Sequence, residues 1–411
     1  MQKAVKYLDY VIYWAIVVIP FSISLGPAFT NILMGFMFFS FLVKKIIKRE
    51  KWFIRTTINI PFILLVVISL LSFKNTIDYH ASVKGLVKLI QNALIFLVCV
   101  EEIKDRRHIG CIVLSVILGA SLSSIDAVWQ ILTGRDFIRG YAPIINIGLK
   151  RATAAFPNAN VFGVYLSAIT PLIIGLALYY FKGRAKVAAL AAAGLASLGV
   201  MLTFSRPTIL ALFLSILFLV IVKKDKVVAG LLLLVLVISP FVAPKGLKDW
   251  ARLINYNPII FMCNHDRISI YRNSLNMIRH HPVLGVGVNT FSKNYLKYKL
   301  PEPENAQTAD NMYAHNTFLQ MAGEIGLLGL LAFLWLLFNL FKRGARIYRS
   351  LSDRYYKIIS LSLSVCLFAF LVNGLTETSL YYARVAMIFW YLAGFSLALE
   401  KFIDADNTSE S

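Results

Sequence analysis

The chain has 411 residues, of which 58% are hydrophobic and 15% charged, and its mean hydropathy is +0.69. Soluble globular proteins have roughly 45–50% apolar and about 25% charged residues, so this composition excludes a soluble enzyme and a disordered chain. The net charge of +21 is of a size found in nucleic-acid-binding domains, but here the basic residues cluster in short segments between apolar runs. The composition therefore indicates a polytopic membrane protein and excludes a nucleic-acid-binding domain.

Twelve apolar segments follow one another along the chain, and a bilayer-spanning helix needs about 20 such residues. They lie at 8–25, 28–47, 58–73, 83–100, 109–132, 160–181, 186–204, 207–222, 226–243, 316–341, 355–373 and 380–400. No small-residue cleavage site follows the first segment, so we expect it to remain as a span. The predicted fold is an all-α polytopic membrane protein of about twelve transmembrane helices. It divides into an N-terminal bundle at 1–243 (about nine spans), a loop domain at 244–314, and C-terminal helices at 315–411 (about three spans with a short cytoplasmic tail).

The distribution of lysine and arginine predicts the orientation. Cytoplasmic loops carry an excess of these residues, counted over short loops. One set of alternating loops is short and holds about 24 of the 42 basic residues, and both chain ends belong to it. We therefore predict that both termini are cytoplasmic and that the long loop lies on the opposite face of the membrane.

The long loop, from Ala243 to Tyr313, contains a pattern typical of a helix. Ile268, Tyr271, Leu275 and Ile278 recur every three or four residues, which places them on one face. The helix must end near His281, because the proline that follows disfavours a helical conformation there. We expect an interfacial helix that lies on the outer leaflet.

The sequence gives no sign of a metal site or a disulfide framework. The four cysteines, Cys99, Cys111, Cys263 and Cys366, include no closely spaced pair. The predicted outer loops contain no paired carboxylates of the kind that hold divalent cations. We expect an activity that needs neither a metal nor another cofactor.

Three arginines on the predicted outer face are candidate ligands for phosphate, since a guanidinium group matches phosphate oxygens in a bidentate fork. Arg206 lies at the membrane edge after an apolar run, where its alternative role is to reach lipid head groups. Arg267 opens the predicted loop helix, where the positive end of the helix dipole does not favour a cation. Arg151 lies just before a span.

One histidine is placed to act as a base. His315 stands at the threshold of the tenth apolar segment, where it is either an interfacial residue or a general base for a sugar hydroxyl. Asn316 could orient it or cap the helix. Glu377 is a carboxylate at a membrane edge, and one reading pairs it with Arg384. Glycines at 323, 326 and 329 favour close helix packing.

These residues stand in motifs that resemble the O-antigen ligase family, which also includes the O-antigen polymerases. Arg267 precedes the stretch 281–287, which resembles the family's Pro-Leu-Leu-Gly-Val-Gly element. His315, Leu319 and Gly326 match the ligase signature of His-Asn/Ser-x-x-Leu followed seven residues later by Gly.

Two further elements extend the resemblance. Residues 203–206 resemble the family's Thr-x-Ser/Thr-Arg at the end of a span. Residues 151–160 resemble its Arg-x-x-Gly-x-Phe-x-Asn-Pro-Asn element, although Ala154 replaces the glycine and the Asn-Pro order is reversed. The likeness runs through the C-terminal two thirds of the chain.

The resemblance implies a membrane glycosyltransferase of the bacterial inner membrane that takes a glycan from undecaprenyl diphosphate. It would pass the glycan to a sugar hydroxyl of lipid A–core on the periplasmic face. The reaction would invert the anomeric centre without a metal, with His315 as base and Arg206, Arg267 and Arg151 at the diphosphate. Its partners would be these two lipids within the membrane, and no nucleic acid.

Two alternatives remain open from the sequence. A polymerase, or a ligase for another acceptor, would share the donor chemistry. A transporter would place ionisable residues inside the spans and use broken helices. Asp126 is the main acidic residue inside a predicted span, so transport is the less favoured alternative.

Overall fold

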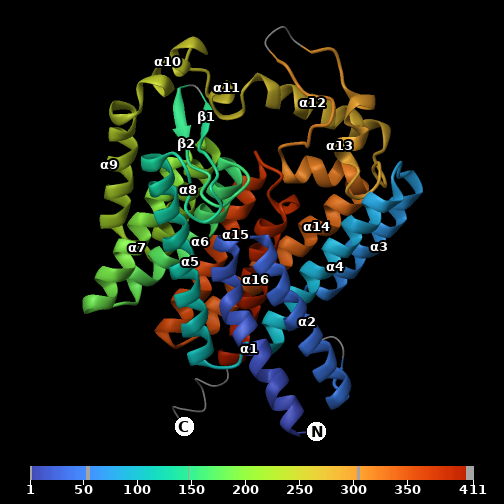
Figure 1. The fold of residues 1–411 in the computed structure, drawn as a ribbon, viewed down its shortest axis with the longest axis vertical. Coiled ribbons are helices and arrows are strands. Elements are labelled where there is room, and N and C mark those ends of the chain that lie inside the picture. The colour runs from blue at the N-terminus through green and yellow to red at the C-terminus, as the bar shows by residue number, and fades with distance from the viewer. Residues whose placement is uncertain (1, 52–55, 147, 303–305, 404–411) are drawn as a thin grey trace.

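The computed structural model describes residues 2–51, 56–146, 148–302 and 306–403, and Figure 1 shows their arrangement. The α-helices are α1 (Gln2–Leu25), α2 (Pro27–Lys48), α3 (Asn59–Leu71), α4 (Tyr79–Glu102), α5 (Arg106–Thr133), α6 (Ala159–Tyr179), α7 (Gly183–Leu202), α8 (Arg206–Lys223), α9 (Lys226–Val242), α10 (Lys245–Leu253), α11 (Pro258–Cys263), α12 (His265–His280), α13 (Phe291–Asn294), α14 (Thr317–Ser350), α15 (Arg354–Gly374) and α16 (Ala383–Ala398). Short 3-10 helices are η1 (Ser72–Asn75), η2 (Tyr295–Tyr298), η3 (Ser379–Tyr381) and η4 (Leu399–Phe402). Strands β1 (Ile144–Asn146) and β2 (Leu149–Arg151) form an antiparallel hairpin.

All twelve predicted apolar segments are helices in the structure. Ten helices of the described residues are long and apolar enough to cross a membrane: α1, α2, α4 to α8 and α14 to α16. The predicted spans at 58–73 and 226–243 correspond to the shorter helices α3 and α9, and α9 joins α10 at a bend of 84°. The chain is an all-α polytopic membrane protein, as its sequence predicts.

The helices share one long direction, and the connecting segments gather at the two ends of the bundle. The start of α1 and the end of α16 lie at one end, whereas α10 to α13 cross the other end (Figure 1). We refer to the end that carries α10 to α13 as the loop face. Both described ends of the chain therefore lie on one side of the bundle and the long loop on the other, as the predicted topology requires.

The core of the bundle lies around α6, α15 and α16. In the most apolar stretch of α6, 89% of the residues are buried. In that of the span Ala383–Phe402, which joins α16 and η4, 83% are buried. The loop-face ends of these three helices carry Ala159, Gly374 and Ala383. Segments that extend from these ends are therefore held on the buried core of the bundle, and they carry Arg151 and Glu377 of the candidate site.

A break in α14 accommodates the segment that follows α12. Ile325 and Gly326 leave the helical conformation, and Gly326 has a φ of 72°. Leu327 N donates to Pro282 O at 2.7 Å, and a Cβ atom at position 326 would lie 2.0 Å from Val283 O. Gly326 therefore packs closely, but against the backbone of the 282–287 segment and not against a second helix as predicted, and a side chain there would displace that backbone.

Helix α12 confirms the predicted loop helix and its end, since the helix stops at His280. The predicted apolar face describes its packing only in part, since Ile278 is buried but other members of that face are not. Leu275 is 47% exposed, while the buried positions include Ile270, Asn273 and Met277, which pack on the loop domain and on α14. Periodicity missed this face because two of the buried side chains, Asn273 and Ser274, are polar and find hydrogen-bond partners.

Candidate active site

The centre of the site is a buried carboxylate, that of Glu377, in the segment between α15 and α16. Its Oε1 atom accepts hydrogen bonds from Arg267 Nη2 and from Asn160 Nδ2, the latter at 2.6 Å. Its Oε2 atom lies 3.3 Å from His315 Nδ1. Side chains from α12, from α6 and from the start of α14 therefore meet at one acidic group.

The electrostatics of this group follow from its neighbours. Burial by itself would raise the pKa of Glu377, but the charge of Arg267 and the contacts with His315 and Asn160 hold that pKa below its ordinary value. Glu377 is therefore ionised at neutral pH, and its charge is compensated by an arginine. A buried charge of this kind is tolerated only when it is paired in this way.

His315 is held by both its backbone and its ring. Its φ of 45° lies in the left-handed region, which few non-glycine residues adopt. Tyr271 Oη lies 3.2 Å from the carbonyl oxygen of His315, which supports that conformation. With Nδ1 facing Glu377, Nε2 has no protein partner among the described residues, and the side chain is 25% exposed. The geometry leaves one ring nitrogen accessible and fixes the other.

Asn316 has a structural position at the start of α14. Its Oδ1 atom accepts from the backbone amides of Phe318 and Leu319 at 2.9 Å each, and its Nδ2 atom donates to Leu375 O at 2.9 Å. Of the two roles considered from the sequence, capping of the helix is the one present. The cap also ties the first turn of α14 to the segment that carries Glu377.

Arg151 joins the cluster through Asn160. Its Nη2 atom donates to Asn160 Oδ1 at 2.6 Å, and its Nε atom donates to Thr203 O at 2.7 Å. Burial lowers the pKa of Arg151, and the nearby charge of Glu377 opposes that effect. Ala154, which replaces a glycine of the family pattern, has a φ of 46°, a conformation in which glycine is unstrained.

Arg206 begins α8 and lies within electrostatic reach of Arg151 and Arg267. Its guanidinium carbon lies 4.1 Å from the ring centroid of Trp250 and 5.3 Å from that of Phe261. Its Nη1 atom is buried and has no hydrogen-bond partner among the described residues. The side chain is covered by aromatic rings of α10 and α11 rather than extended to a lipid surface, so the head-group interpretation does not describe it.

The pairing of Glu377 with Arg384 is wrong. Arg384 is buried in α16, where Nη1 donates to Ile23 O at 3.1 Å and Nη2 donates to Ala155 O at 2.8 Å. Its guanidinium also lies over the ring of Phe156, 3.9 Å from the centroid. Arg384 therefore joins α16 to the end of α1 and to the segment that contains Ala155. Arg267, and not Arg384, pairs with Glu377.

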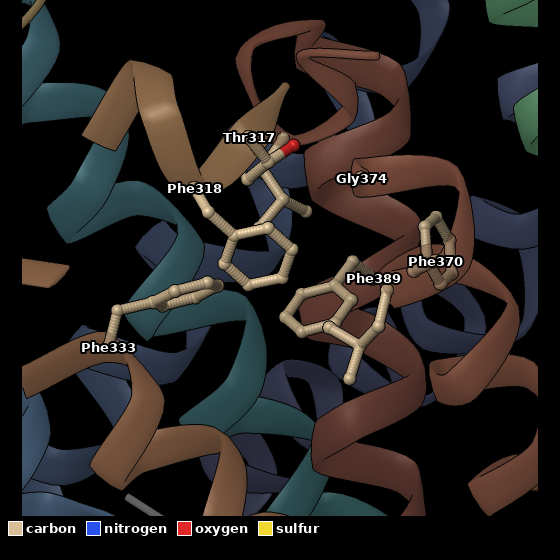
Figure 2. A pocket seen from close by; sticks show the side chains of 8 residues that line it. Thr317, Phe318, Phe333, Phe370, Gly374 and Phe389 are labelled. Carbon is tan, nitrogen blue, oxygen red and sulfur yellow. The ribbon is translucent and has the colours of Figure 1, made fainter. Parts of the chain in front are cut away.

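The floor beneath the cluster is apolar. Figure 2 shows Thr317 above the rings of Phe318, Phe333 and Phe389, which surround a void of about 10 Å³. Thr317 Oγ1 donates to Glu377 O at 2.9 Å, so the polar cluster rests directly on this aromatic layer. A floor without polar groups keeps water away from one side of the charges.

Three residues of the site were not singled out from the sequence, namely Asn160, Trp250 and Phe261, and Tyr271 was named only as part of the apolar face of the loop helix. Asn160 stands in the motif that opens with Arg151, so its position was visible even though its role was not. Trp250 and Phe261 carry no sequence signal beyond their location in the long loop. In the described part of the chain, no group of three or more His, Cys, Asp or Glu side chains could hold a metal ion.

Residues 190–334 match the family model described as O-antigen ligase. The matched stretch includes Arg206, Arg267 and His315, whereas Arg151 and Glu377 lie outside it. A search of curated proteins gives no match to the chain.

Proposed function

Because residues 190–334 match the family model described as O-antigen ligase, we propose that the chain is a membrane-embedded glycosyltransferase of this family. The proposed donor is a glycan linked to undecaprenyl diphosphate, and the proposed acceptor is a sugar hydroxyl of lipid A–core. Transfer would occur at the loop face, on the periplasmic side of the inner membrane, with inversion and without a metal or other cofactor.

The observation that carries this proposal is the convergence of one base and a set of arginines on a single carboxylate. Glu377 contacts His315 and Arg267 directly and reaches Arg151 through Asn160. Transfer from a glycosyl diphosphate requires a deprotonated acceptor and a stabilised leaving group. A base beside several cations meets both requirements.

His315 would perform the first task. The Glu377 carboxylate accepts from a protonated Nδ1, which leaves the lone pair on Nε2. Nε2 would remove the proton of the acceptor hydroxyl as its oxygen attacks the anomeric carbon. The bond between that carbon and the diphosphate oxygen breaks, and the electron pair leaves with undecaprenyl diphosphate.

The arginines would perform the second task. The departing diphosphate gains negative charge, and Arg206 and Arg267 are fixed cations in a partly water-excluded site. The unsatisfied Nη1 of Arg206 is a donor without a protein acceptor among the described residues. A phosphate oxygen would satisfy it once Trp250 or Phe261 moved aside.

The structure gives different support to the two alternatives, a related glycosyltransferase and a transporter. A polymerase, or a ligase for a different acceptor, would use the same base and arginines and differ only in the hydroxyl that attacks. For a transporter, Asp126 would have to take part in transport, but it accepts the backbone amide of Phe137 at 2.8 Å and so anchors the loop after α5.

The test is transfer by the purified protein from a polyprenyl-diphosphate glycan, with each candidate acceptor omitted in turn and with excess EDTA. The proposal predicts product only with lipid A–core and no effect of EDTA. Chain extension of the donor in the absence of lipid A–core would identify a polymerase. Loss of activity that magnesium or manganese restores would contradict the metal-independent mechanism.

A further inference from the structure

A second cavity lies away from the arginine cluster, between α2, α3, α4, α14 and α16. Its volume is about 490 Å³, which is in the range of sites for small molecules and lipid tails. Apolar and aromatic side chains form most of its walls, including Phe38, Leu65, Phe333 and Trp390. The helices around it are candidate spans or the short apolar helix α3, so the cavity lies within the membrane-embedded part of the bundle.

One wall of this cavity carries a cation. Lys88 lines the cavity from α4, nine residues after the helix begins at Tyr79, which is about 13 Å along the helix axis. Its side chain is exposed, and among the described residues it has no ion pair or hydrogen bond. A charged side chain within a membrane span costs a few kcal/mol unless a partner or water compensates it.

Polar side chains accompany the lysine. Asn31 from α2 and Gln91 and Asn92 from α4 line the same cavity, together with Asn289 from the segment before α13. The cavity therefore combines apolar walls with a small set of hydrogen-bonding groups and one positive charge. This combination fits an amphiphile with a hydrocarbon part and an anionic head.

We propose that the cavity is a binding site for a lipid with a phosphate head group, and that Lys88 binds the phosphate. The hydrocarbon chain lies along Phe38, Leu65 and Trp390, where it covers apolar surface. A free phosphate ion would satisfy Lys88 but would leave those walls uncovered. A neutral lipid would cover the walls but leave the cation without a partner.

The occupant would lie behind the candidate active site. Leu380 and Tyr381 line the cavity and follow Glu377 in the same short segment. Tyr381 Oη donates to Glu324 Oε2 at 2.9 Å, at the break in α14. The lipid would thus support the segment that holds Glu377, but this inference does not depend on the proposed reaction.

The test uses the full-length protein in phosphatidylcholine nanodiscs that contain a small fraction of phosphatidic acid with a photoreactive tail. Crosslinked peptides are mapped by mass spectrometry, and diacylglycerol with the same tail is the neutral comparison. We expect phosphatidic acid, and not diacylglycerol, to label α2, α4 and α14 at the cavity. Millimolar inorganic phosphate should not compete, and competition would show that the site binds the free ion instead.

Two variants examine the head and the tail separately. Lys88→Gln should reduce labelling by about ten- to a hundredfold, because a charge-assisted contact contributes roughly 1.5–3 kcal/mol, whereas Lys88→Arg should retain it. Gly35→Leu should also reduce labelling, since Gly35 lines the cavity and a Cβ atom there meets nothing within 4 Å.

Gly194→Leu is the matched control, because Gly194 in α7 has equally open surroundings and does not line the cavity. Thermal unfolding of each variant shows whether it is folded. Wild-type labelling of folded Lys88→Gln and Gly35→Leu would overturn the proposal. Equal labelling by diacylglycerol would also overturn it, because the site would then not select phosphate.

Discussion

The substitution Glu377→Gln removes one negative charge from the centre of the site and keeps the shape of the side chain. The amide oxygen can still accept from Asn160 and Arg267, but the amide nitrogen then faces His315 and cannot accept from its protonated Nδ1. Contacts to a charged group contribute roughly 1.5–3 kcal/mol and neutral ones about 0.5–1.5 kcal/mol. The two contacts with Arg267 and His315 should therefore lose about 2 kcal/mol together.

If those contacts orient the base and an arginine in the transition state, the transfer rate should fall by about 30-fold. The assay is the initial rate of glycan transfer by purified protein at neutral pH, with thermal unfolding measured in parallel. Glu400→Gln is the matched control, because Glu400 pairs with Arg343 at the opposite end of the bundle. A folded Glu377→Gln variant with the wild-type rate would refute the reasoning.

Four further outcomes are expected. Arg206→Lys should lower transfer by about ten- to a hundredfold, because a point charge cannot reproduce the bidentate fork; a rate near wild type would leave this arginine without a role at the diphosphate. Gly326→Ala should destabilise the protein by about 2 kcal/mol or more in thermal or denaturant unfolding, because a Cβ atom there meets backbone at a φ of 72°. The pKa of Glu377 is lower in the folded protein than its ordinary value of 4.5, so its stabilising contribution is complete above that pH and is lost as the pH falls through the lowered pKa. The stability difference between wild type and Glu377→Gln should therefore close only below about pH 4.5, measured by unfolding between pH 3 and 7. In a background without native cysteines, an impermeant thiol reagent on intact cells should label Ala309→Cys and not Ser352→Cys, whereas the reverse would invert the topology.

The helices could be predicted from the sequence because a lipid environment permits few backbone conformations. Backbone polar groups in lipid must be satisfied within the segment, so each long apolar run becomes a helix. The end of α12 at His280 was also predictable, since it follows from the local effect of Pro282. These features depend on short stretches of chain.

The break in α14 could not be predicted in the same way. Gly326 was expected to pack closely, but the segment that packs on it begins at Pro282, more than 40 residues earlier. Glu324 and the glycines at 323, 326 and 329 interrupt the apolar pattern, but they do not show that the helix breaks at 325–326. Contacts between distant segments decide such a feature, and a single sequence does not show them.

Most residues of the candidate site could be named from the sequence, but the central position of Glu377 could not be predicted. Arg206, Arg267 and His315 stand out because charged residues at membrane edges are costly and fall in recognisable motifs. Glu377 was considered only as a supporting residue and was paired with Arg384, which is close in sequence. The actual neighbours of Glu377 come from α6, α12 and α14, which only the packing of the bundle brings together.

The most direct test of the central claim separates donor binding from turnover in His315→Ala. Binding of the polyprenyl-diphosphate glycan is measured by titration, and transfer to lipid A–core is measured on the same preparation. The account predicts donor affinity within a few-fold of wild type and a transfer rate lower by about 10²–10⁴. Transfer at the wild-type rate, or loss of donor binding in a folded variant, would contradict the assignment of His315 as the base.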